Sequence, residues 1–469
     1  TPSLRFTIRV ALTVALGGFL MGFDASVISG VVGFIEPEFD LSKFELGWAV
    51  ASLTLTSTMA MMLAGPISDR FGRRPVLKVA ALLFTVSALA SAVAPDYITL
   101  VAARMLGGFG VGAALIIAPM YIAEIAPPAV RGRMVSFNQL NIVIGISAAY
   151  FSNYLILSLG QSDLGWAQAL RFGDWNWRWM LGVEALPAIF YFFALLFVPE
   201  SPRWLVMKGR NEDALGILEQ VSSKAQAEKD LTAVRESLQA EAHQEKGTFR
   251  ELFQPAMKLV LTIGISVAIL QQITGINSVF FYAPMIFEQS GIGTDAAFMQ
   301  AVMVGIVNLV FTVTAILLID KLGRRPLLIA GLAIISFCML LLAWAFSAAS
   351  YTPGGELVGV NPVIILIGIL GFVAGFAISL GPVMWVLFSE LFPNRIRGIA
   401  ISFVGLINSS VSFLVQLVFP WELENFGPST TFLIYGIFAV IGLVFVFRTL
   451  PETKGRSLEE LEAELVSGK

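Results

Sequence analysis

The sequence predicts an all-α membrane protein with twelve transmembrane helices in two six-helix halves. Of the 469 residues, 57% are hydrophobic and only 13% are charged. Soluble chains carry about 25% charged residues. Apolar windows of about 20 residues, the length that crosses a bilayer as a helix, recur twelve times. Motifs in the loops of the first half also return in the second half. These observations together predict the fold class.

The twelve apolar windows give the predicted spans in order. The first window is too long for a signal peptide and continues into a multi-span pattern, so we expect no cleavable leader. The predicted spans are residues 10–34, 46–66, 76–94, 98–119, 134–157, 179–199, 257–288, 297–319, 327–348, 362–387, 399–420 and 430–450.

Basic residues lie mainly in the loops that follow even-numbered spans. The opposite loops are mostly acidic or neutral, with Lys43, Arg171 and Arg178 as their few basic residues. Loops rich in Lys and Arg stay in the cytoplasm. We therefore expect a multi-pass protein of the cell membrane with both termini cytoplasmic. The basic residues concerned are Arg70, Arg73, Arg74, Lys78, Arg131, Arg133, Lys321, Arg324, Arg325, Arg395 and Arg397.

One long polar stretch interrupts the spans. It has helix-like patterning around residues 211–222 and 227–244. We predict residues 1–200 as the first six-helix half, 201–255 as a cytoplasmic linker with short helices, 256–450 as the second half and 451–469 as a cytoplasmic tail. The linker either only joins the halves or also acts as a latch, and both interpretations stay open.

Loop motifs show that a six-span unit was duplicated. Residues 68–75 (SDRFGRRP) return as 319–326 (IDKLGRRP), and residues 199–201 (PES) return as 451–453 (PET). Glu124 followed by Arg131 returns as Glu390 followed by Arg397. Six spans are an even number, so the copies are parallel repeats. Transporters built from repeats bind substrate near mid-membrane at the interface of the repeats, and one half rocks against the other.

These motifs also carry a family resemblance. The paired loops resemble the signature of the major facilitator superfamily. Residues 199–204 (PESPRW), 271–277 (QQITGIN) and 451–455 (PETKG) are similar to the sugar porter family within it. The resemblance spans essentially the whole chain, and it implies the twelve-helix fold and a polyhydroxylated, sugar-like substrate. The doubled loops alone would imply only the superfamily.

Amides and one tryptophan inside apolar spans are the substrate-binding candidates. Gln and Asn offer both donors and acceptors to sugar hydroxyls, and the resemblance implies sugar contacts at these positions. The alternative is hydrogen bonding between helices, which contributes about 0.6–2 kcal/mol. The substrate is expected to be a monosaccharide or a cyclitol, and which one stays open. The candidates are Gln139, Gln271, Gln272, Asn277, Asn308, Trp385 and Asn408.

The amide cluster at residues 271–277 predicts a broken helix. On an unbroken helix Gln272 and Asn277 would point about 140° apart. Both face one cavity if the helix loosens near Thr274 and Gly275, where glycine makes unwinding cheap. Phe281 and Tyr282 follow closely and are candidates for an outer gate. The alternative for these aromatic residues is packing against lipid.

Charged residues inside apolar spans point to proton coupling. A charge there costs about 2.5–3.5 kcal/mol and usually lines a pathway, so Asp24 and Arg104 are predicted to form a buried pair. Asp24 is expected about 12 residues below the outer end of its span. His243, the only histidine, lies in a polar segment, so proton transfer must use carboxylates. Glu184 is the third candidate, as a secondary proton site or a group that tunes Arg104.

The resemblance implies the same role for the pair. An acid at the Asp24 position is typical of proton-coupled sugar porters, where passive carriers often have Asn. Arg104 matches the arginine paired with that acid in the family. The alternative is a purely structural pair that holds the first half together.

Charged motifs at the cytoplasmic helix ends are candidates for gating. Their signs alternate at facing ends, so we expect pairs across the two halves that close the inside of a bistable interface. The alternative is anchoring of the topology by basic residues. The residues are Asp69, Arg73, Glu124, Arg131, Asp320, Arg324, Glu390 and Arg397.

The sequence thus favours proton-coupled symport of a monosaccharide or cyclitol by alternating access. A passive sugar uniporter is the main alternative, and a transporter-like nutrient sensor is a weaker one because no long signalling tail follows the last span. The spans hold no His cluster, metal-ligand set or activated nucleophile, so we expect neither an enzyme nor a cofactor. Expected partners are the sugar or polyol, protons and the lipid bilayer, with no nucleic acid, and a monomer.

Overall fold

The computed structural model describes residues 2–244, 247–393, 395–453 and 463–465. Twelve helical segments within these ranges are long and apolar enough to cross a membrane. The predicted twelve-helix fold is therefore confirmed. Most of the tail predicted at residues 451–469 lies outside the described residues.

The chain divides into two compact units, and each is described by itself. Unit 1 contains Thr1–Val31 and Ser52–Gln244, and unit 2 contains Val32–Ala51 and Glu245–Lys469. Residues 32–51 therefore group with the second unit although they precede most of the first in sequence.

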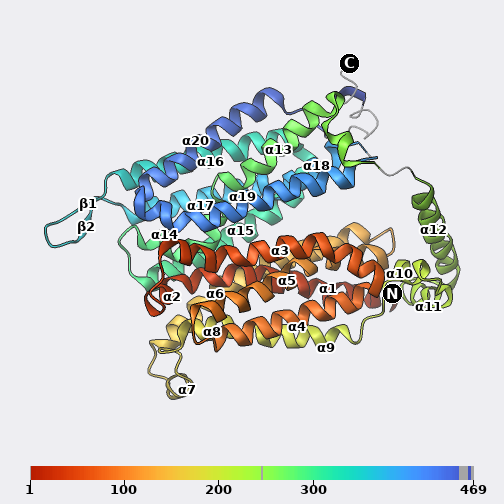
Figure 1. Cartoon of the computed structure of the whole chain (residues 1–469), viewed down its shortest axis with the longest axis horizontal. Coiled ribbons are helices and arrows are strands. Elements are labelled where there is room, and N and C mark those ends of the chain that lie inside the picture. The colour runs from red at the N-terminus through yellow and green to blue at the C-terminus, as the bar shows by residue number, and fades with distance from the viewer. Residues whose placement is uncertain (1, 245–246, 394, 454–462, 466–469) are drawn as a thin grey trace. The chain divides into compact units, whose positions relative to one another are not determined.

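Unit 1 consists of helices (Figure 1). Its elements are α1 (Pro2–Ser26), η1 (Val27–Gly30), most of α3 (Lys43–Phe71), α4 (Arg73–Ala92), α5 (Tyr97–Ile125), α6 (Arg131–Gly160), α7 (Gly165–Ala169), α8 (Asn176–Gly182), α9 (Ala185–Leu195), α10 (Pro202–Met207), α11 (Asn211–Val221) and α12 (Lys224–His243).

Glycines bring α1 and α6 close together. A Cβ on Gly22 would lie 2.1 Å from the carbonyl oxygen of Ile142, and one on Gly145 would lie 2.1 Å from that of Phe19. Only glycine permits so close an approach of two backbones. This contact fixes α1, the helix that carries Asp24, against the rest of the unit.

The first span differs from its predicted limits, residues 10–34. Helix α1 begins at Pro2 because Arg5 and Arg9 are helical but too polar to enter a hydropathy window. It ends at Ser26, where the apolar sequence continues as the 3₁₀ turn η1. Asp24 is therefore six residues before Gly30, at the end of the span, rather than 12 residues below its end.

The sixth span consists of two short helices. Helix α8 ends at Gly182 and α9 begins at Ala185, with Glu184 at the N-cap position between them. The outward face of α9 is apolar: Leu186, Phe190 and Phe193 are 72%, 66% and 56% exposed. Such a face suits a lipid environment, since water would not favour it.

Helices α10 to α12 occupy the stretch predicted as a linker. The hydroxyl of Ser201 caps α10 by accepting from the main-chain N–H of Trp204. The indole of Trp204 donates to the carbonyl of Asp69 over 2.9 Å, and Arg203 on α10 pairs with Glu241 on α12 over 2.7 Å. These contacts tie the linker helices to unit 1, near the start of α1 in Figure 1.

Unit 2 is also helical, with one small hairpin that projects from it (Figure 1). Its elements are α2 (Val32–Glu38), the start of α3, η2 (Phe249–Phe253), η3 (Pro255–Met257), α13 (Lys258–Ile273), α14 (Ile276–Glu288), α15 (Thr294–Leu322), α16 (Arg324–Ser347), β1 (Ser350–Tyr351), β2 (Leu357–Val358), α17 (Pro362–Ile378), α18 (Leu380–Leu391), α19 (Arg397–Asn425) and α20 (Gly427–Thr449). Strands β1 and β2 pair antiparallel.

The break predicted near Thr274 and Gly275 is present. Helix α13 ends at Ile273 and α14 begins at Ile276, and Gly275 between them has a left-handed φ of 99°. A side chain there would be strained, and its Cβ would lie 2.7 Å from the ring of Tyr435. Glycine is therefore what allows the chain to turn between the two amide-bearing helices.

Candidate functional site

Asp24 on α1 and Arg104 on α5 form a buried ion pair in unit 1. The Nη1 atom of Arg104 lies 3.1 Å from Asp24 Oδ1 and also donates to the main-chain oxygen of Asp24 over 2.9 Å. The two residues are 2% and 1% exposed. Bonding to the backbone as well as to the side chain holds the guanidinium at the end of α1.

Glu184 completes this cluster. It is 1% exposed and interacts electrostatically with both Asp24 and Arg104. Within the described residues, Asp24 Oδ2, Glu184 Oε1 and the Nε and Nη2 atoms of Arg104 are buried without a hydrogen-bond partner. Two carboxyl groups thus face one guanidinium in a closed site with unused bonding capacity.

Two small residues that the sequence analysis did not select make room for Asp24. A Cβ on Gly107 would lie 2.6 Å from Asp24 Oδ2 and 2.6 Å from Ser87 Oγ. The hydroxyl of Ser87 donates to the carbonyl of Ala103 over 2.7 Å. Gly107 lies three residues after Arg104, on the same face of α5, and this spacing was the available sequence signal.

Four of the predicted substrate-binding amides form one hydrogen-bonded chain in unit 2. Asn408 Nδ2 donates to Gln271 Oε1 over 2.8 Å, and Gln272 Nε2 donates to the same oxygen over 3.1 Å. Asn277 Nδ2 donates to Gln272 Oε1 over 2.7 Å. The chain joins α19, α13 and α14, so the break at Gly275 does bring Gln272 and Asn277 together.

Two further residues extend this chain on α19. Asn277 Nδ2 also donates to Ser412 Oγ over 2.7 Å, and Gln416 Nε2 donates to the same oxygen over 2.8 Å. Both residues are buried, at 5% and 1% exposed. Asn408, Ser412 and Gln416 are four residues apart and share one helix face, a pattern from which the sequence could have identified them.

The remaining substrate-binding candidates are not members of this hydrogen-bonded chain. Gln139 is exposed on α6 of unit 1. Asn308 is buried on α15, and Trp385 on α18 is 45% exposed and packs edge to face on Phe388 with ring centres 5.8 Å apart. In the part of the chain that the structure describes, no hydrogen bond joins these three to the amide chain.

The two aromatic gate candidates differ in exposure. Tyr282 is completely buried, its hydroxyl donates to the carbonyl of Gln416 over 2.8 Å, and its ring centre is 5.2 Å from that of Phe419. Phe281 is only half-buried. Of the two, Phe281 is therefore the one that offers surface to a ligand or a lid.

The charged motif of unit 1 forms a compact network around Arg73. Its guanidinium binds both oxygens of Glu124, over 2.8 and 3.0 Å, and Asp69 over 2.7 Å. Glu200 accepts from the main-chain N–H groups of Arg73 and Arg74, and Ser201 donates to Glu124 over 2.8 Å. Burial raises the pKa of Glu200 above its ordinary value, although these N–H groups oppose the shift.

Unit 2 repeats this network residue for residue. Arg324 binds both oxygens of Glu390 over 3.1 and 2.6 Å and lies 3.5 Å from Asp320. Glu452 accepts from the main-chain N–H groups of Arg324 and Arg325, each over 3.1 Å, and Thr453 bonds to Glu390. The duplication seen in the sequence therefore extends to individual hydrogen bonds.

The ion pairs of Arg73 and Arg324 described above lie within their own units, whereas the sequence analysis expected pairs across the two halves, which stay a prediction. Arg73 and Arg324 each reach a carboxylate at the end of a neighbouring helix of their own unit. Arg131 and Arg397 donate to main-chain carbonyls five residues earlier, of Ala126 over 3.3 Å and of Phe392 over 3.1 Å. Alternating signs along the sequence do not tell which helix ends adjoin.

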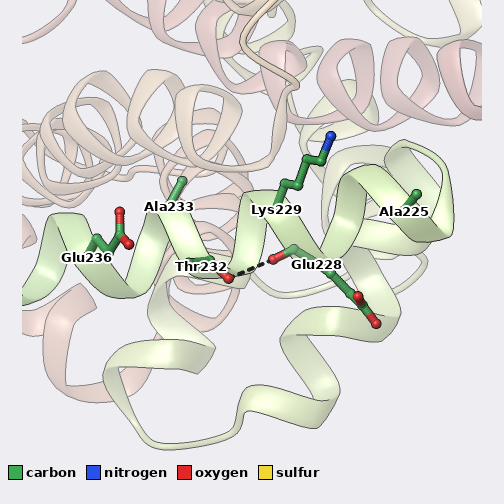
Figure 2. Close-up of a pocket in the computed structure, with 6 residues that line it drawn as sticks. All are labelled: Ala225, Glu228, Lys229, Thr232, Ala233 and Glu236. Carbon is green, nitrogen blue, oxygen red and sulfur yellow. Dashed lines mark hydrogen bonds between the residues drawn. The ribbon is translucent and has the colours of Figure 1, made fainter.

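A shallow hollow on α12 carries none of the predicted residues. Its lining comes from one exposed helix, where Thr232 Oγ1 donates to the carbonyl of Glu228 over 3.0 Å (Figure 2). A hydroxyl bonded to the preceding turn is ordinary helix chemistry. The lining residues are Ala225, Glu228, Lys229, Thr232, Ala233 and Glu236.

Comparison with known proteins identifies the family. The family described as "Sugar (and other) transporter" matches residues 10–465. The arabinose-proton symporter of Bacillus subtilis is 38% identical over 460 residues, which cover 98% of this chain and 95% of that protein. The D-xylose-proton symporter of Escherichia coli is 38% identical over 491 residues, with the same coverage.

A solved structure supports the same assignment. The E. coli xylose transporter XylE in an inward-open conformation has a TM-score of 0.81 and 36% identity, and the match covers 97% of this chain and 99% of that one. The proteins named above are transporters rather than enzymes. Their alignments with this chain include all twelve predicted spans. The chain therefore belongs to the sugar transporter family, the sugar porters of the major facilitator superfamily.

Proposed function

We propose that this chain is a proton-coupled symporter of a monosaccharide, foremost a pentose such as D-xylose or L-arabinose, and works by alternating access. The observation that carries the proposal is the buried Asp24–Arg104 pair with Glu184 beside it. A closed ionic cluster with unsatisfied atoms is costly in a membrane. Two relatives at 38% identity, named as arabinose-proton and D-xylose-proton symporters, support the same activity.

The cluster explains how a proton enters the cycle. With both carboxyl groups ionised, Asp24, Glu184 and Arg104 carry a net charge of −1, and one proton makes the cluster neutral. A neutral cluster passes through an occluded state at lower cost. The membrane potential adds about 2.3 kcal/mol per charge per 100 mV to inward movement of the proton. Asp24 is the proposed main proton site and Glu184 the secondary one.

The sugar contacts are proposed on the amides. Gln271, Gln272, Asn277 and Asn408 supply hydrogen-bonding groups from one connected chain, and a sugar hydroxyl both donates and accepts. Gln139 and Asn308 are proposed as further polar contacts and Trp385 as a stacking surface for the C–H face of the ring. A cyclitol fits the same chemistry.

The proposed topology, gating contacts and oligomeric state follow from the sequence. We place both termini in the cytoplasm, because basic residues concentrate in the loops on that side. The networks of Arg73 and Arg324 hold the cytoplasmic helix ends during gating, and Arg131 and Arg397 support them. The protein acts as a monomer in the lipid bilayer, with residues 201–255 as its cytoplasmic linker.

Proteoliposomes that contain a pH dye test the proposal. We expect D-xylose or L-arabinose, in a panel with D-glucose and myo-inositol, to acidify the vesicle interior as it enters. The Asp24→Asn variant should lose acidification and uphill accumulation while it still exchanges sugar across the membrane. Asp96→Asn is the matched control, because Asp96 is an exposed cap of α5 bonded to the N–H of Thr99.

One result would contradict symport, and another would contradict the role of Asp24. Entry of labelled sugar without acidification would make the protein a passive uniporter. Accumulation against a gradient by Asp24→Asn would show that Asp24 is only a structural charge.

A further inference from the structure

Two main-chain carbonyls give the amide chain of unit 2 a fixed direction. Asn408 Nδ2 lies 2.9 Å from the carbonyl oxygen of Ala268, and Gln271 Nε2 lies 2.9 Å from that of Leu380. A carbonyl oxygen only accepts hydrogen bonds. Both side-chain amides must therefore turn their NH₂ groups toward the backbone.

The orientation of each amide fixes the orientation of the next one in the chain. With its NH₂ group on Leu380, Gln271 offers only Oε1 to its neighbours, and that oxygen accepts from Asn408 Nδ2 and Gln272 Nε2. Gln272 then offers its own Oε1, which accepts from Asn277 Nδ2. Each amide can adopt one orientation only, because reversing any of them would set two donors or two acceptors against each other.

Asn408 and Asn277 use all their NH₂ hydrogens within the protein, which leaves their Oδ1 atoms as unused acceptors. Asn408 uses both NH₂ hydrogens, on Ala268 and Gln271, and Asn277 uses both of its own, on Gln272 and Ser412. Their Oδ1 atoms accept no bond from the described residues, and neither is among the buried atoms without a partner. Both oxygens are therefore incompletely buried and keep unused acceptor capacity.

Ser412 keeps Asn277 in this orientation. Its Oγ accepts from Asn277 Nδ2 over 2.7 Å and from Gln416 Nε2 over 2.8 Å. A hydroxyl oxygen has two acceptor positions, so both are occupied and Ser412 can only donate to anything further. By taking the second hydrogen of Asn277, it turns Oδ1 of that residue outward.

We propose that this half of the site presents acceptors to its substrate, through Asn277 Oδ1 and Asn408 Oδ1, and so selects sugars by hydroxyl groups that donate. Ser412 is its positioning residue. The inference rests on the proposed function and deepens it, since it states which role each recognised hydroxyl must play. A buried polar group left unpaired by a ligand that cannot donate costs affinity.

Analogues of D-xylose test the direction of these bonds. Replacing a hydroxyl by hydrogen removes donor and acceptor, whereas replacing it by fluorine removes only the donor. We would measure Kd by calorimetry on the purified protein for the mono-deoxy and mono-deoxyfluoro series at C2, C3 and C4. At two or more positions, the fluoro sugar should bind as weakly as the deoxy sugar, at least about tenfold below D-xylose.

Variants of Ser412 separate positioning from stability. In Ser412→Ala, Asn277 keeps its bond to Gln272 Oε1, but its second Nδ2 hydrogen loses its acceptor and becomes able to donate to a ligand. Affinity for D-xylose should therefore fall about tenfold, and the fluoro sugars should regain affinity relative to the deoxy sugars. Ser412→Thr keeps the hydroxyl and should retain the wild-type pattern. Ser410→Ala is the matched control: Ser410 is exposed two residues away and bonds only to the carbonyl of Leu406 on its own helix. A residue that merely stabilised the fold would not change the fluoro-to-deoxy ratio.

The outcomes separate this inference from the proposed function. If fluorine restores affinity at all but one position, or if Ser412→Ala leaves both affinity and pattern unchanged, the acceptor-facing site is wrong while symport stands. If wild-type protein binds neither D-xylose nor L-arabinose, the proposed function fails and this inference fails with it.

Discussion

The two units are alike at their charged helix ends and different inside. At the ends, Arg73 with Glu124 and Arg324 with Glu390 form the same bidentate bonds. Inside, unit 1 holds the ionic cluster of Asp24, Arg104 and Glu184, whereas unit 2 holds a chain of neutral amides.

This difference shows what each interior is suited to do. A neutral amide chain cannot take up a proton near neutral pH, whereas a cluster that contains carboxylates can. The charged ends of the two units thus share the same contacts, whereas their interiors differ. In the proposed symport, coupling requires the two interiors to respond to the same movement.

Removing Arg104 should lower the melting temperature most, and this would sharpen the contrast between the ionic interior of unit 1 and the neutral interior of unit 2. Arg104→Met leaves buried carboxyl groups without their cation, and breaking a buried pair costs about 3–5 kcal/mol. We expect a clear fall in the melting temperature in detergent. The double variant with Asp24→Asn should recover part of it, because one of the two uncompensated carboxylates is gone.

An exposed arginine provides the control for that experiment. Arg171 is 53% exposed and pairs with Asp174 over 3.4 Å, so Arg171→Met should leave the melting temperature nearly unchanged. If Arg104→Met were as stable as this control, the cluster would not be the ionic core described above.

The second prediction concerns the duplicated ends. Glu124→Gln and Glu390→Gln each replace a charged acceptor of a bidentate arginine, and hydrogen bonds to charged groups contribute about 1.5–3 kcal/mol. The two variants should lower the melting temperature by similar amounts, with Glu124 slightly the larger because it is 10% exposed against 20% for Glu390.

Glu236→Gln, at an exposed position on α12, is the matched control for both variants. If the melting temperatures of Glu124→Gln and Glu390→Gln fell by very different amounts, the two helix ends would not be energetically equivalent despite their equal geometry. Thermal unfolding followed by intrinsic tryptophan fluorescence would measure it.

The smallest effect is expected in the amide chain. Asn408→Leu removes bonds to Ala268 and Gln271, and hydrogen bonds between membrane helices average about 0.6 kcal/mol with a maximum near 1.7. The melting temperature should fall less than in Arg104→Met. An equal or larger fall would mean that the neutral interior stabilises its unit as much as the ionic one does.

Much of the architecture was predictable from the sequence because it depends on local properties. Span number follows from the length of apolar windows, and the repeat follows from motifs such as those around Arg73 and Arg324. The break at Gly275 followed from the angle between Gln272 and Asn277 on an ideal helix. The limits of the first span were wrong, because hydropathy does not register a helix end that carries Arg5 and Arg9.

Apart from the Asp24–Arg104 pair, which the two lone charges predicted, contacts between helices were decided only by the tertiary structure. The sequence indicated that Arg73, Glu124 and their counterparts carry opposite charges, but packing decided that they pair within one unit. The sequence analysis did not select Ser412 or Gln416 either. Their spacing of four residues from Asn408 places them on one helix face, but only the bond from Asn277 shows that Ser412 belongs to the amide chain. Apolar length and motif order are properties of neighbouring residues, whereas a partner distant in the chain is chosen by how whole helices fit together.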